Sequence, residues 1–165
     1  MGIQGEYRER CSWDTDITAH LGILYAWARR GGVMVELGVR SGNSTCALLA
    51  GAEASGGHLI SVDVEEPDVP AHWRDLPYWK LIIGHDQDPA VLDQIYTNLS
   101  LLFIDTSHLA ADTRNELALY GPRVKPGGVI LLHDTDQEGV SGPLTDYAPG
   151  WYQHVRDHGL GVIEV

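Results

Sequence analysis

Five short apolar runs, separated by amphipathic segments, constrain the fold of this chain more than any other feature of its sequence. The runs are Val33–Leu37, Leu59–Asp63, Lys80–Ile83, Leu101–Asp105 and Val129–His133. They lack a strict alternation of apolar and polar residues, which is typical of strands buried on both faces of a parallel sheet. Such strands, alternating with helical segments, predict a doubly wound, Rossmann-like α/β fold with helices on both faces. We expect a mostly parallel sheet in the strand order 3-2-1-4-5, followed by a short sixth strand over Gly159–Val165.

The segments between the runs predict the helices and loops of this fold. Apolar residues at helical spacing predict a helix over Asp16–Arg30, which Gly31 and Gly32 end. Met1–Trp13 shows no such period and is predicted to be irregular. Glu138–Pro149 is rich in Gly, Pro, Ser and Asp, which predicts a loop. Further helices are predicted over Asn43–Ala54, Pro89–Tyr96, Ala110–Tyr120 and Gly150–His158.

Length and charge restrict the class of protein. The chain has 165 residues, which predicts a single domain over 1–165, with residues 1–30 as an N-terminal cap and helix. Its net charge is −12, from 23 acidic and 11 basic residues, so neither nucleic acids nor membranes are expected partners. Cys11 and Cys46 have no zinc-site spacing. With no signal peptide and no apolar stretch long enough to span a membrane, a cytoplasmic protein is predicted. We expect a small-molecule partner, and homo-oligomers are compatible with the sequence.

Polar side chains gather where the predicted strands end. In an open α/β sheet, ligands bind beyond the carboxyl ends of the strands. His108 and His133 lie close to two of these ends. Acidic residues lie at or just after all five strands, and they include Glu36, Asp63, Asp86, Asp105 and Asp134. We therefore expect these groups to meet at one edge of the sheet and to form the functional site.

The loop after the first strand is the most informative of these strand ends. Gly38 and Gly42 lack a Cβ, so the backbone can turn sharply there and approach a ligand closely. A helix that starts at Asn43 or Ser44 would direct free N–H groups toward a carboxylate or a phosphate. Asp63 follows at the sequence distance where a carboxylate accepts both hydroxyls of a ribose. The alternative is an ordinary turn between a strand and a helix, in which glycine is common.

Nicotinamide dinucleotides are the main rival ligands for such a loop. Their fingerprint, G-x-G-x-x-G, has its first two glycines separated by one residue. Here Gly38 and Gly42 are four positions apart, with Arg40 between them. This wider loop favours a ligand without a pyrophosphate, so a nicotinamide-dependent oxidoreductase is the less favoured alternative.

Four segments, taken in order along the chain, resemble a known family. They are Val35–Ser44, Gly84–Asp88, Leu102–His108 and Lys125–Thr135. Together they resemble the class I S-adenosylmethionine-dependent methyltransferases, of the small-molecule O-methyltransferase type that includes catechol, sugar and macrolide O-methyltransferases. The resemblance covers about Val33–Thr135. It implies methylation of a hydroxyl group on a small acceptor, such as a sugar or a natural product.

The resemblance also implies which residues bind S-adenosylmethionine. Glu36 and Gly38 would line its methionine end, close to the amide groups of Asn43 and Ser44. Asp63 would accept the ribose hydroxyls. The cofactor-binding set is completed by Arg40, Gly42, Asp86, Gln87 and Asp105, of which Asp86 and Gln87 would hold the adenine.

The reacting groups implied by the resemblance are two acidic residues and two histidines. His108 and Asp105 would be catalytic, with His108 as the general base. Asp105, His133 and Asp134 would ligate a divalent cation, Mg²⁺ or Mn²⁺, which lowers the pKa of a bound hydroxyl. Imidazole suits a transition metal better than Mg²⁺, so a metal-free site is an alternative. Structural alternatives are that His108 and Asp105 cap local structure and that His133 is a core histidine.

Several features leave alternatives open. Trp73, Tyr78 and Trp79 would either wall the adenine pocket or pack into the core. The chain ends near the predicted sixth strand, which is compatible with a minimal enzyme, a shortened chain, or a non-catalytic or partner-dependent S-adenosylmethionine-binding module. The remaining histidines are predicted at the surface; they are His20, His58, His72, His154 and His158.

Overall fold

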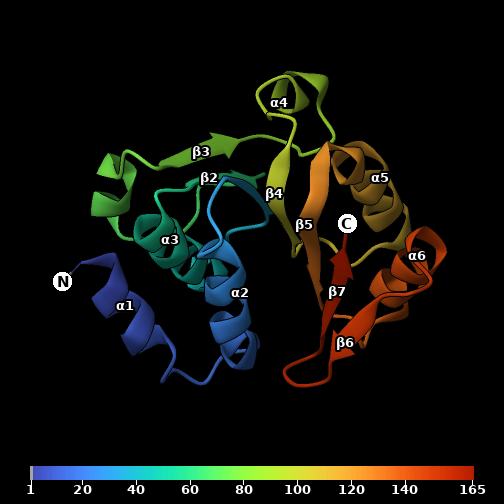
Figure 1. The fold of residues 1–165 in the computed structure, drawn as a ribbon, viewed down its shortest axis with the longest axis horizontal. Helices are drawn as coiled ribbons and strands as arrows, with labels where there is room; N and C mark the ends of the chain where they lie inside the picture. The colour runs from blue at the N-terminus through green and yellow to red at the C-terminus, as the bar shows by residue number, and fades with distance from the viewer. Residues whose placement is uncertain (1) are drawn as a thin grey trace.

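The computed structural model describes residues 2–165 and contains one seven-stranded sheet with helices on both sides (Figure 1). Among β1 to β5 the paired strands run parallel, whereas β7 is antiparallel to both β5 and β6. The order in the sheet is β3-β2-β1-β4-β5-β7-β6, so the predicted order 3-2-1-4-5 and the Rossmann-like fold are confirmed. The strands are β1 (Val33–Leu37), β2 (His58–Asp63), β3 (Trp79–Ile83), β4 (Leu99–Ile104), β5 (Val124–His133), β6 (Tyr152–His154) and β7 (Leu160–Glu164).

Helices connect or flank these strands. Helix α3 consists largely of good helix formers and ends at Gly56, whose φ of 70° is one that glycine tolerates. The α-helices of the described residues are α1 (Ile3–Arg10), α2 (Leu21–Ala28), α3 (Asn43–Ser55), α4 (Pro89–Leu92), α5 (Ala110–Tyr120) and α6 (Glu138–Tyr147). Short 3₁₀ helices cover Thr18–His20, Ala71–Asp75 and Gly121–Arg123.

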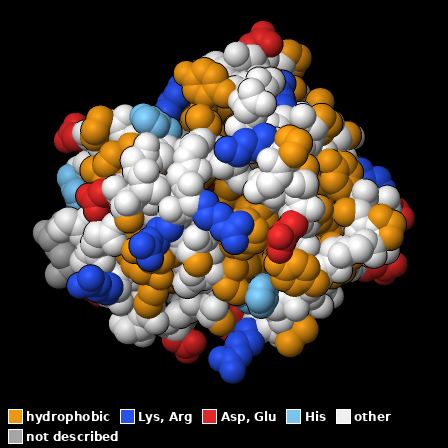
Figure 2. Space-filling view, in the orientation of Figure 1, with side chains coloured by type: hydrophobic (Ala, Val, Ile, Leu, Met, Phe, Trp, Pro, Cys, Tyr) orange, Lys and Arg blue, Asp and Glu red, His pale blue; other side chains and the backbone are white. Residues whose placement is uncertain are grey.

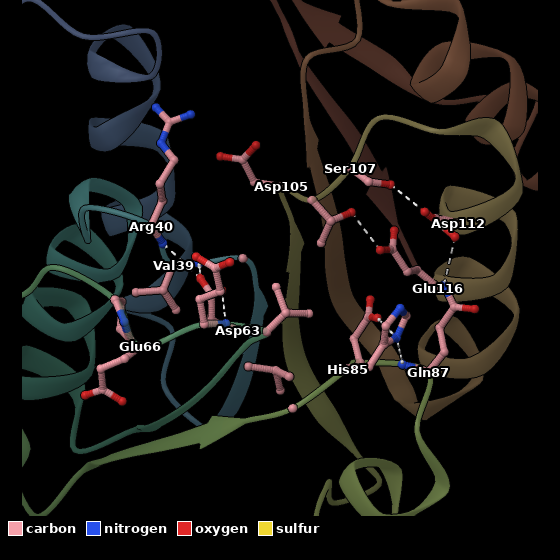
Figure 3. A pocket seen from close by; sticks show the side chains of 18 of the residues that line it. Val39, Arg40, Asp63, Glu66, His85, Gln87, Asp105, Ser107, Asp112 and Glu116 are labelled. Atoms are coloured by element: carbon pink, nitrogen blue, oxygen red, sulfur yellow. Dashed lines mark hydrogen bonds and ion pairs between the residues drawn. The ribbon is translucent and has the colours of Figure 1, made fainter.

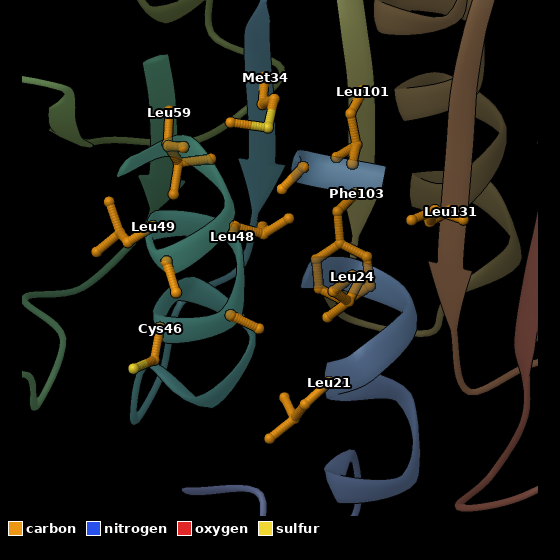
Figure 4. Close-up of a cluster of buried hydrophobic side chains, with 14 of the residues drawn as sticks. Leu21, Leu24, Met34, Cys46, Leu48, Leu49, Leu59, Leu101, Phe103 and Leu131 are labelled. Carbon is orange, nitrogen blue, oxygen red and sulfur yellow. The ribbon is translucent and has the colours of Figure 1, made fainter. Parts of the chain in front are cut away.

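Alternate residues of the central strands pack into two separate cores. On one face, Met34 of β1, Leu59 of β2 and Phe103 of β4 pack with residues of α1, α2 and α3 (Figure 4). On the other face, Val35 of β1 and Leu102 of β4 pack with apolar residues of α4, α5 and α6. Successive side chains of a strand point to opposite faces of the sheet. Both faces are covered, which explains why each strand is a continuous apolar run in the sequence.

The N-terminal segment is more helical than the sequence indicates. The irregular stretch predicted over Met1–Trp13 is wrong, because helix α1 occupies most of it; Met1 itself lies outside the described residues. Ile3 of this weakly amphipathic helix is buried against the core on the α3 side. The helix predicted over Asp16–Arg30 is shorter and consists of a 3₁₀ turn followed by α2. The helix predicted over Pro89–Tyr96 is regular only in α4.

The C-terminal segment also differs from the prediction. Glu138–Pro149, predicted as a loop, contains helix α6, because Val140 and Leu144 share one side of it and are buried with residues of α5. Gly150–His158, predicted as a helix, instead contains strand β6, which pairs with β7. In both places tertiary contacts override the local propensity of the sequence.

Two predictions on aromatic and histidine residues are decided by burial. The surface position predicted for His20 is wrong: the residue is 1% exposed, its Nε2 lies 2.6 Å from the carbonyl oxygen of Arg156, and burial lowers its pKa. Trp73 is fully buried, and Tyr78 and Trp79 pack against the same core, so the packing alternative holds for all three. The other four histidines are exposed as predicted; they are His58, His72, His154 and His158.

No helix within residues 2–165 is long and apolar enough to cross a membrane. On the face seen in Figure 2, Lys and Arg side chains form small separate groups. This face therefore lacks the continuous basic stripe through which proteins bind the phosphates of nucleic acids.

Candidate active site

The carboxyl ends of β1 to β4 surround a cavity of about 540 Å³, here called the larger cavity (Figure 3). The predicted site residues that line it are Gly38, Arg40, Asp63, Asp86, Gln87 and Asp105. A smaller cavity of about 90 Å³ is lined by three further predicted residues, Asn43, Ser44 and His108. Gly38, Arg40 and Asp105 line both cavities, so the two adjoin at the end of β1.

Gly38 and Gly42 are required by packing within the protein. Gly38 has a φ of 89°, and a Cβ there would overlap the carbonyl oxygen of Asp105. Gly42 has a φ of 73°, and a Cβ there would lie 2.6 Å from Val69 and 2.8 Å from Trp73. The predicted reason for these glycines, close approach to a ligand, is therefore incomplete. Gly38 also lines the cavities, whereas Gly42 is among the lining residues of neither.

Asp63 holds the loop between β1 and α3 in place. Its Oδ2 accepts hydrogen bonds from the backbone N–H groups of Val39 (2.8 Å) and Arg40 (3.0 Å), and its Oδ1 accepts one from Glu65 (3.1 Å). Figure 3 shows Asp63 on one side of the larger cavity, opposite Gln87. Because a carboxylate oxygen accepts more than one hydrogen bond, Asp63 is able to bind hydroxyl groups of a ligand as well.

Helix α3 begins at Asn43, as predicted, and directs its N-terminus toward the smaller cavity. No side chain caps this helix start. The Asn43 side chain instead accepts a hydrogen bond from Arg10 Nη1 (2.5 Å), and the Ser44 hydroxyl donates to Glu36 (2.7 Å). The backbone N–H groups of the first turn, which carry a partial positive charge, are therefore suited to a carboxylate ligand.

Glu36 lies behind this loop, outside both cavities. It is fully buried and accepts hydrogen bonds from the hydroxyl groups of Ser44 (2.7 Å), Thr45 (2.8 Å) and Ser61 (2.6 Å). Burial raises its pKa to about 7, although the three hydroxyl groups act in the opposite direction. Glu36 thus supports the first turn of α3, and its place at the methionine end of a cofactor stays a prediction.

Helix α5 braces the loop that carries Asp86 and Gln87. The Tyr120 hydroxyl donates to the carbonyl oxygen of Asp86 (2.5 Å), and the Gln87 side chain bonds to Asp112 (3.3 Å) and Asn115 (3.0 Å). The sequence did not predict that α5 supports the loop with Asp86 and Gln87. One signal was available, since Asp112, Glu116 and Tyr120 are spaced by four residues and share one face of the helix.

Asp105, His108, His133 and Asp134 form one cluster beside the smaller cavity. His108 Nε2 lies 2.7 Å from Asp134 Oδ2 and 3.7 Å from Asp105 Oδ1. His133 Nδ1 lies 3.1 Å from Asp134 Oδ2 and 3.6 Å from Asp105 Oδ1. His108 and Asp134 have positive φ angles of 57° and 58°, and such strained conformations are often found at functional sites. The structure thus brings together every predicted catalytic and metal-ligating residue.

His133 is the most constrained member of the cluster. Its Nε2 lies 3.1 Å from the carbonyl oxygen of Asp16 and 2.9 Å from that of Asp157. Carbonyl oxygens only accept hydrogen bonds, so Nε2 carries a proton, and only Nδ1 is able to contact a cation. Burial alone would lower the pKa of His133, but Asp105 and Asp134 outweigh it and raise this pKa to about 10.

The carboxylates and imidazoles of the cluster stabilise each other's charges. Burial would raise the pKa of Asp105, but the neighbouring imidazoles of His108 and His133 hold it well below its usual range. The pKa of Asp134 is also lowered, because His133 and His108 outweigh the effect of its burial. The nearby carboxylates of Asp105 and Asp134 raise the pKa of His108.

A protein-family model described as a methyltransferase domain matches residues 35–135, more than half of the chain. The chain belongs to this methyltransferase domain family. The matched segment contains every site residue predicted above, and it disfavours the nicotinamide-dependent oxidoreductase. No curated protein sequence matches this methyltransferase.

Solved structures share the fold of this methyltransferase at low sequence identity. A protein of Corynebacterium glutamicum has a TM-score of 0.75 and 15% identity, over 98% of this chain and 88% of that chain. The MycE methyltransferase of mycinamycin biosynthesis, in complex with Mg and SAH, has a TM-score of 0.69 and 19% identity, over 98% of this chain but only 53% of its own. CalS11, a TDP-rhamnose 3′-O-methyltransferase, has a TM-score of 0.68 and 16% identity, over 88% of this chain and 77% of that chain.

Proposed function

We propose that this methyltransferase binds S-adenosylmethionine in the larger cavity and transfers the methyl group to a hydroxyl oxygen of a small acceptor, such as a sugar or a natural product. One observation carries the proposal: the larger cavity, with Asp63 and Asp86 in its wall, meets the Asp105, His108 and Asp134 cluster where the smaller cavity begins. Neighbours of the same fold include SAH-bound methyltransferases and a TDP-rhamnose 3′-O-methyltransferase, which supports this choice.

The cavity suits a nucleoside that carries an amino acid. Its volume, about 540 Å³, lies within the range usual for small-molecule sites. Asp63 would accept hydrogen bonds from the ribose hydroxyls, and Asp86 with Gln87 would bind the adenine. The backbone around Gly38 and the N-terminus of α3 would bind the carboxylate of the methionine part.

The neighbouring cluster supplies the proton chemistry. S-adenosylmethionine provides an electrophilic methyl group on a sulfonium, and an alcohol is a weak nucleophile near neutral pH. His108 would take the proton of the acceptor hydroxyl through Nδ1, because Nε2 lies 2.7 Å from a carboxylate oxygen of Asp134 and donates a hydrogen bond to it. Asp105 and Asp134 would orient this imidazole and stabilise its positive charge after proton transfer.

A divalent cation fits the same cluster. Ligand atoms of Asp105, His108 and Asp134 all lie within 4.8 Å of one another, a set of two carboxylates and one imidazole. Such a cation would lower the pKa of the acceptor hydroxyl. A neutral imidazole has a single nitrogen lone pair, so His108 serves either as a metal ligand or as a proton acceptor, and the two roles exclude each other.

Metal removal tests this assignment. We expect chelation with EDTA to lower turnover by at least about tenfold, and Mn²⁺ to restore it at lower concentration than Mg²⁺ if an imidazole is a ligand. Titration of Mn²⁺ into His108→Ala, followed by electron paramagnetic resonance, separates the two roles of His108. Unchanged Mn²⁺ affinity assigns it as the base, and lost affinity as a ligand. Turnover that is indifferent to EDTA would rule out the cation.

Isothermal titration calorimetry with SAH tests the proposed cofactor. We expect saturable binding with one site per chain. If the folded protein binds neither SAH nor S-adenosylmethionine at concentrations up to about 1 mM, the proposed function is wrong.

Replacing Asp63 by alanine should weaken SAH binding by about 10- to 100-fold, because hydrogen bonds to a charged group are lost. Calorimetry measures the change. Glu65→Ala is the matched control, since Glu65 lines the same cavity but has no proposed ligand contact, and it should change affinity by less than about threefold. Equal losses in both variants would contradict the role of Asp63. Thermal unfolding of both variants checks that the loop between β1 and α3 stays folded.

A further inference from the structure

The inner wall of the larger cavity contains two buried carboxyl groups from different elements. Asp86 follows β3 and is 8% exposed, and Glu116 lies on α5 and is 1% exposed. Both line the cavity, and Figure 3 shows Glu116 in its wall. Within residues 2–165, only four buried side-chain polar atoms lack a hydrogen-bond partner, and Asp86 Oδ2 and Glu116 Oε2 are two of them.

The other oxygen of each carboxyl group has a partner. Thr106 Oγ1 donates to Glu116 Oε1 (2.6 Å), and His85 Nδ1 lies 2.9 Å from Asp86 Oδ1. The residues one turn before and one turn after Glu116 on α5 both contact the loop that carries Asp86: Asp112 accepts a hydrogen bond from Gln87 (3.3 Å), and Tyr120 donates one to the carbonyl oxygen of Asp86 (2.5 Å). Glu116, between them on the same face of the helix, therefore faces Asp86. A single proton between Oε2 and Oδ2 would therefore satisfy both unpaired atoms. Without it, two negative charges would face each other in a buried site.

We propose that Glu116 and Asp86 share one proton, and that Glu116 is thereby a positioning residue which holds Asp86 for the amino group of an adenine base. The proposal rests on the proposed function, in which Asp86 binds the adenine. Glu116 donates a hydrogen bond to Oδ2 of Asp86. Asp86 therefore keeps its negative charge, and its other oxygen, Oδ1, is oriented toward the base.

The surroundings favour the proton on Glu116. Burial, together with the neighbouring Asp86 and Asp112, raises the pKa of Glu116 to about 8. Thr106, from the end of β4, donates a hydrogen bond but carries no charge. The titratable groups that face the pair from the neighbouring elements are His85, Asp112 and Tyr120, and Arg123 acts on Tyr120.

The shared proton is tested first without a ligand. Between the ordinary pKa of 4.5 and the raised value of about 8, folded Glu116 holds a proton that the unfolded chain has lost, so stability falls as the pH rises through this range. The denaturation midpoint of the wild type should therefore fall between pH 5 and pH 9 relative to that of Glu116→Gln. Glu36, which is present in both proteins, cancels in the comparison. Parallel midpoint curves would overturn the shared proton.

Ligand affinity then tests the positioning role. The probe is methylthioadenosine, a nucleoside without the titratable amino acid part of SAH. Wild-type affinity should fall at least about threefold from pH 7 to pH 9, as the shared proton is lost. Glu116→Gln, whose amide donates to Asp86 at any pH, should show no such fall, and Glu65→Gln should keep the wild-type profile. Glu116→Ala should bind weakly at every pH.

The outcomes separate this inference from the proposed function. If the wild type binds the nucleoside but Glu116→Gln loses affinity with pH as the wild type does, the positioning role of Glu116 is wrong. If neither methylthioadenosine nor SAH binds the wild type at any pH, the proposed function is wrong. The midpoint comparison still decides whether the proton is shared.

Discussion

Gly38→Val should lower the free energy of unfolding by about 2–6 kcal/mol and abolish SAH binding. Two costs add at this position. A β-branched residue is strained at a φ of 89°, and its Cβ would overlap the carbonyl oxygen of Asp105. The end of β1 and the end of β4 would have to separate, and these two strand ends form the wall that both cavities share. Urea denaturation measures the stability, and calorimetry measures the binding.

Gly127→Val separates the two costs. Gly127 has a similar φ of 79°, but a Cβ there would meet no atom within 4 Å. This variant carries the backbone strain alone and should lose no more than about 1–3 kcal/mol, with SAH binding unchanged. If both variants lose the same stability, the overlap with the backbone of Asp105 adds no cost at Gly38 beyond the backbone strain.

His108→Ala should lower methyl transfer by about 10²- to 10⁴-fold while SAH affinity changes by less than about threefold. The imidazole is proposed to act on the acceptor hydroxyl, and it lines the smaller cavity rather than the larger one. The measurement is formation of SAH from S-adenosylmethionine in the presence of nucleotide sugars or glycosylated macrolides. His72→Ala is the control, because His72 also pairs with a carboxylate, Glu6 (2.8 Å), but lies outside both cavities.

Two results would contradict this role of His108. Turnover close to that of the wild type would mean that another group accepts the proton. A loss of SAH affinity as large as the loss of turnover would mean that His108 supports the cofactor cavity. In either case the cluster of Asp105, His108 and Asp134 would need a different assignment.

The sheet was predictable because burial on both faces leaves a strong signal. Each of the five parallel strands is a run of apolar residues with a polar residue at or just after its end, and that pattern determined which side chains meet. Helix α6 was not predictable in the same way. Its Gly, Pro and Ser residues indicate a loop, and only the contacts of Val140 and Leu144 with the core beside α5 stabilise it. Strand β6 likewise depends on its partner β7, which follows it in the sequence.

The candidate site was predictable as a set of residues but not in its internal contacts. Sequence position indicated that Asp86, Asp105 and Asp134 approach one edge of the sheet. It did not indicate that Glu116, thirty positions after Asp86, would lie against it, since two carboxyl groups are not expected to pair. The role of Gly38 was also only partly predictable, because its neighbour, the backbone of Asp105, is distant in the sequence.

The two backbone carbonyls that fix His133 come from opposite ends of the chain, Asp16 and Asp157. A ribosome makes the chain from its N-terminus, so the residues that line the larger cavity, the last of which is Glu116, are made before residue 157. The imidazole of His133 cannot form its hydrogen bond to the carbonyl oxygen of Asp157 until residue 157 has been made. The cluster of Asp105, His108, His133 and Asp134 is therefore completed only after every residue that lines the larger cavity has been made.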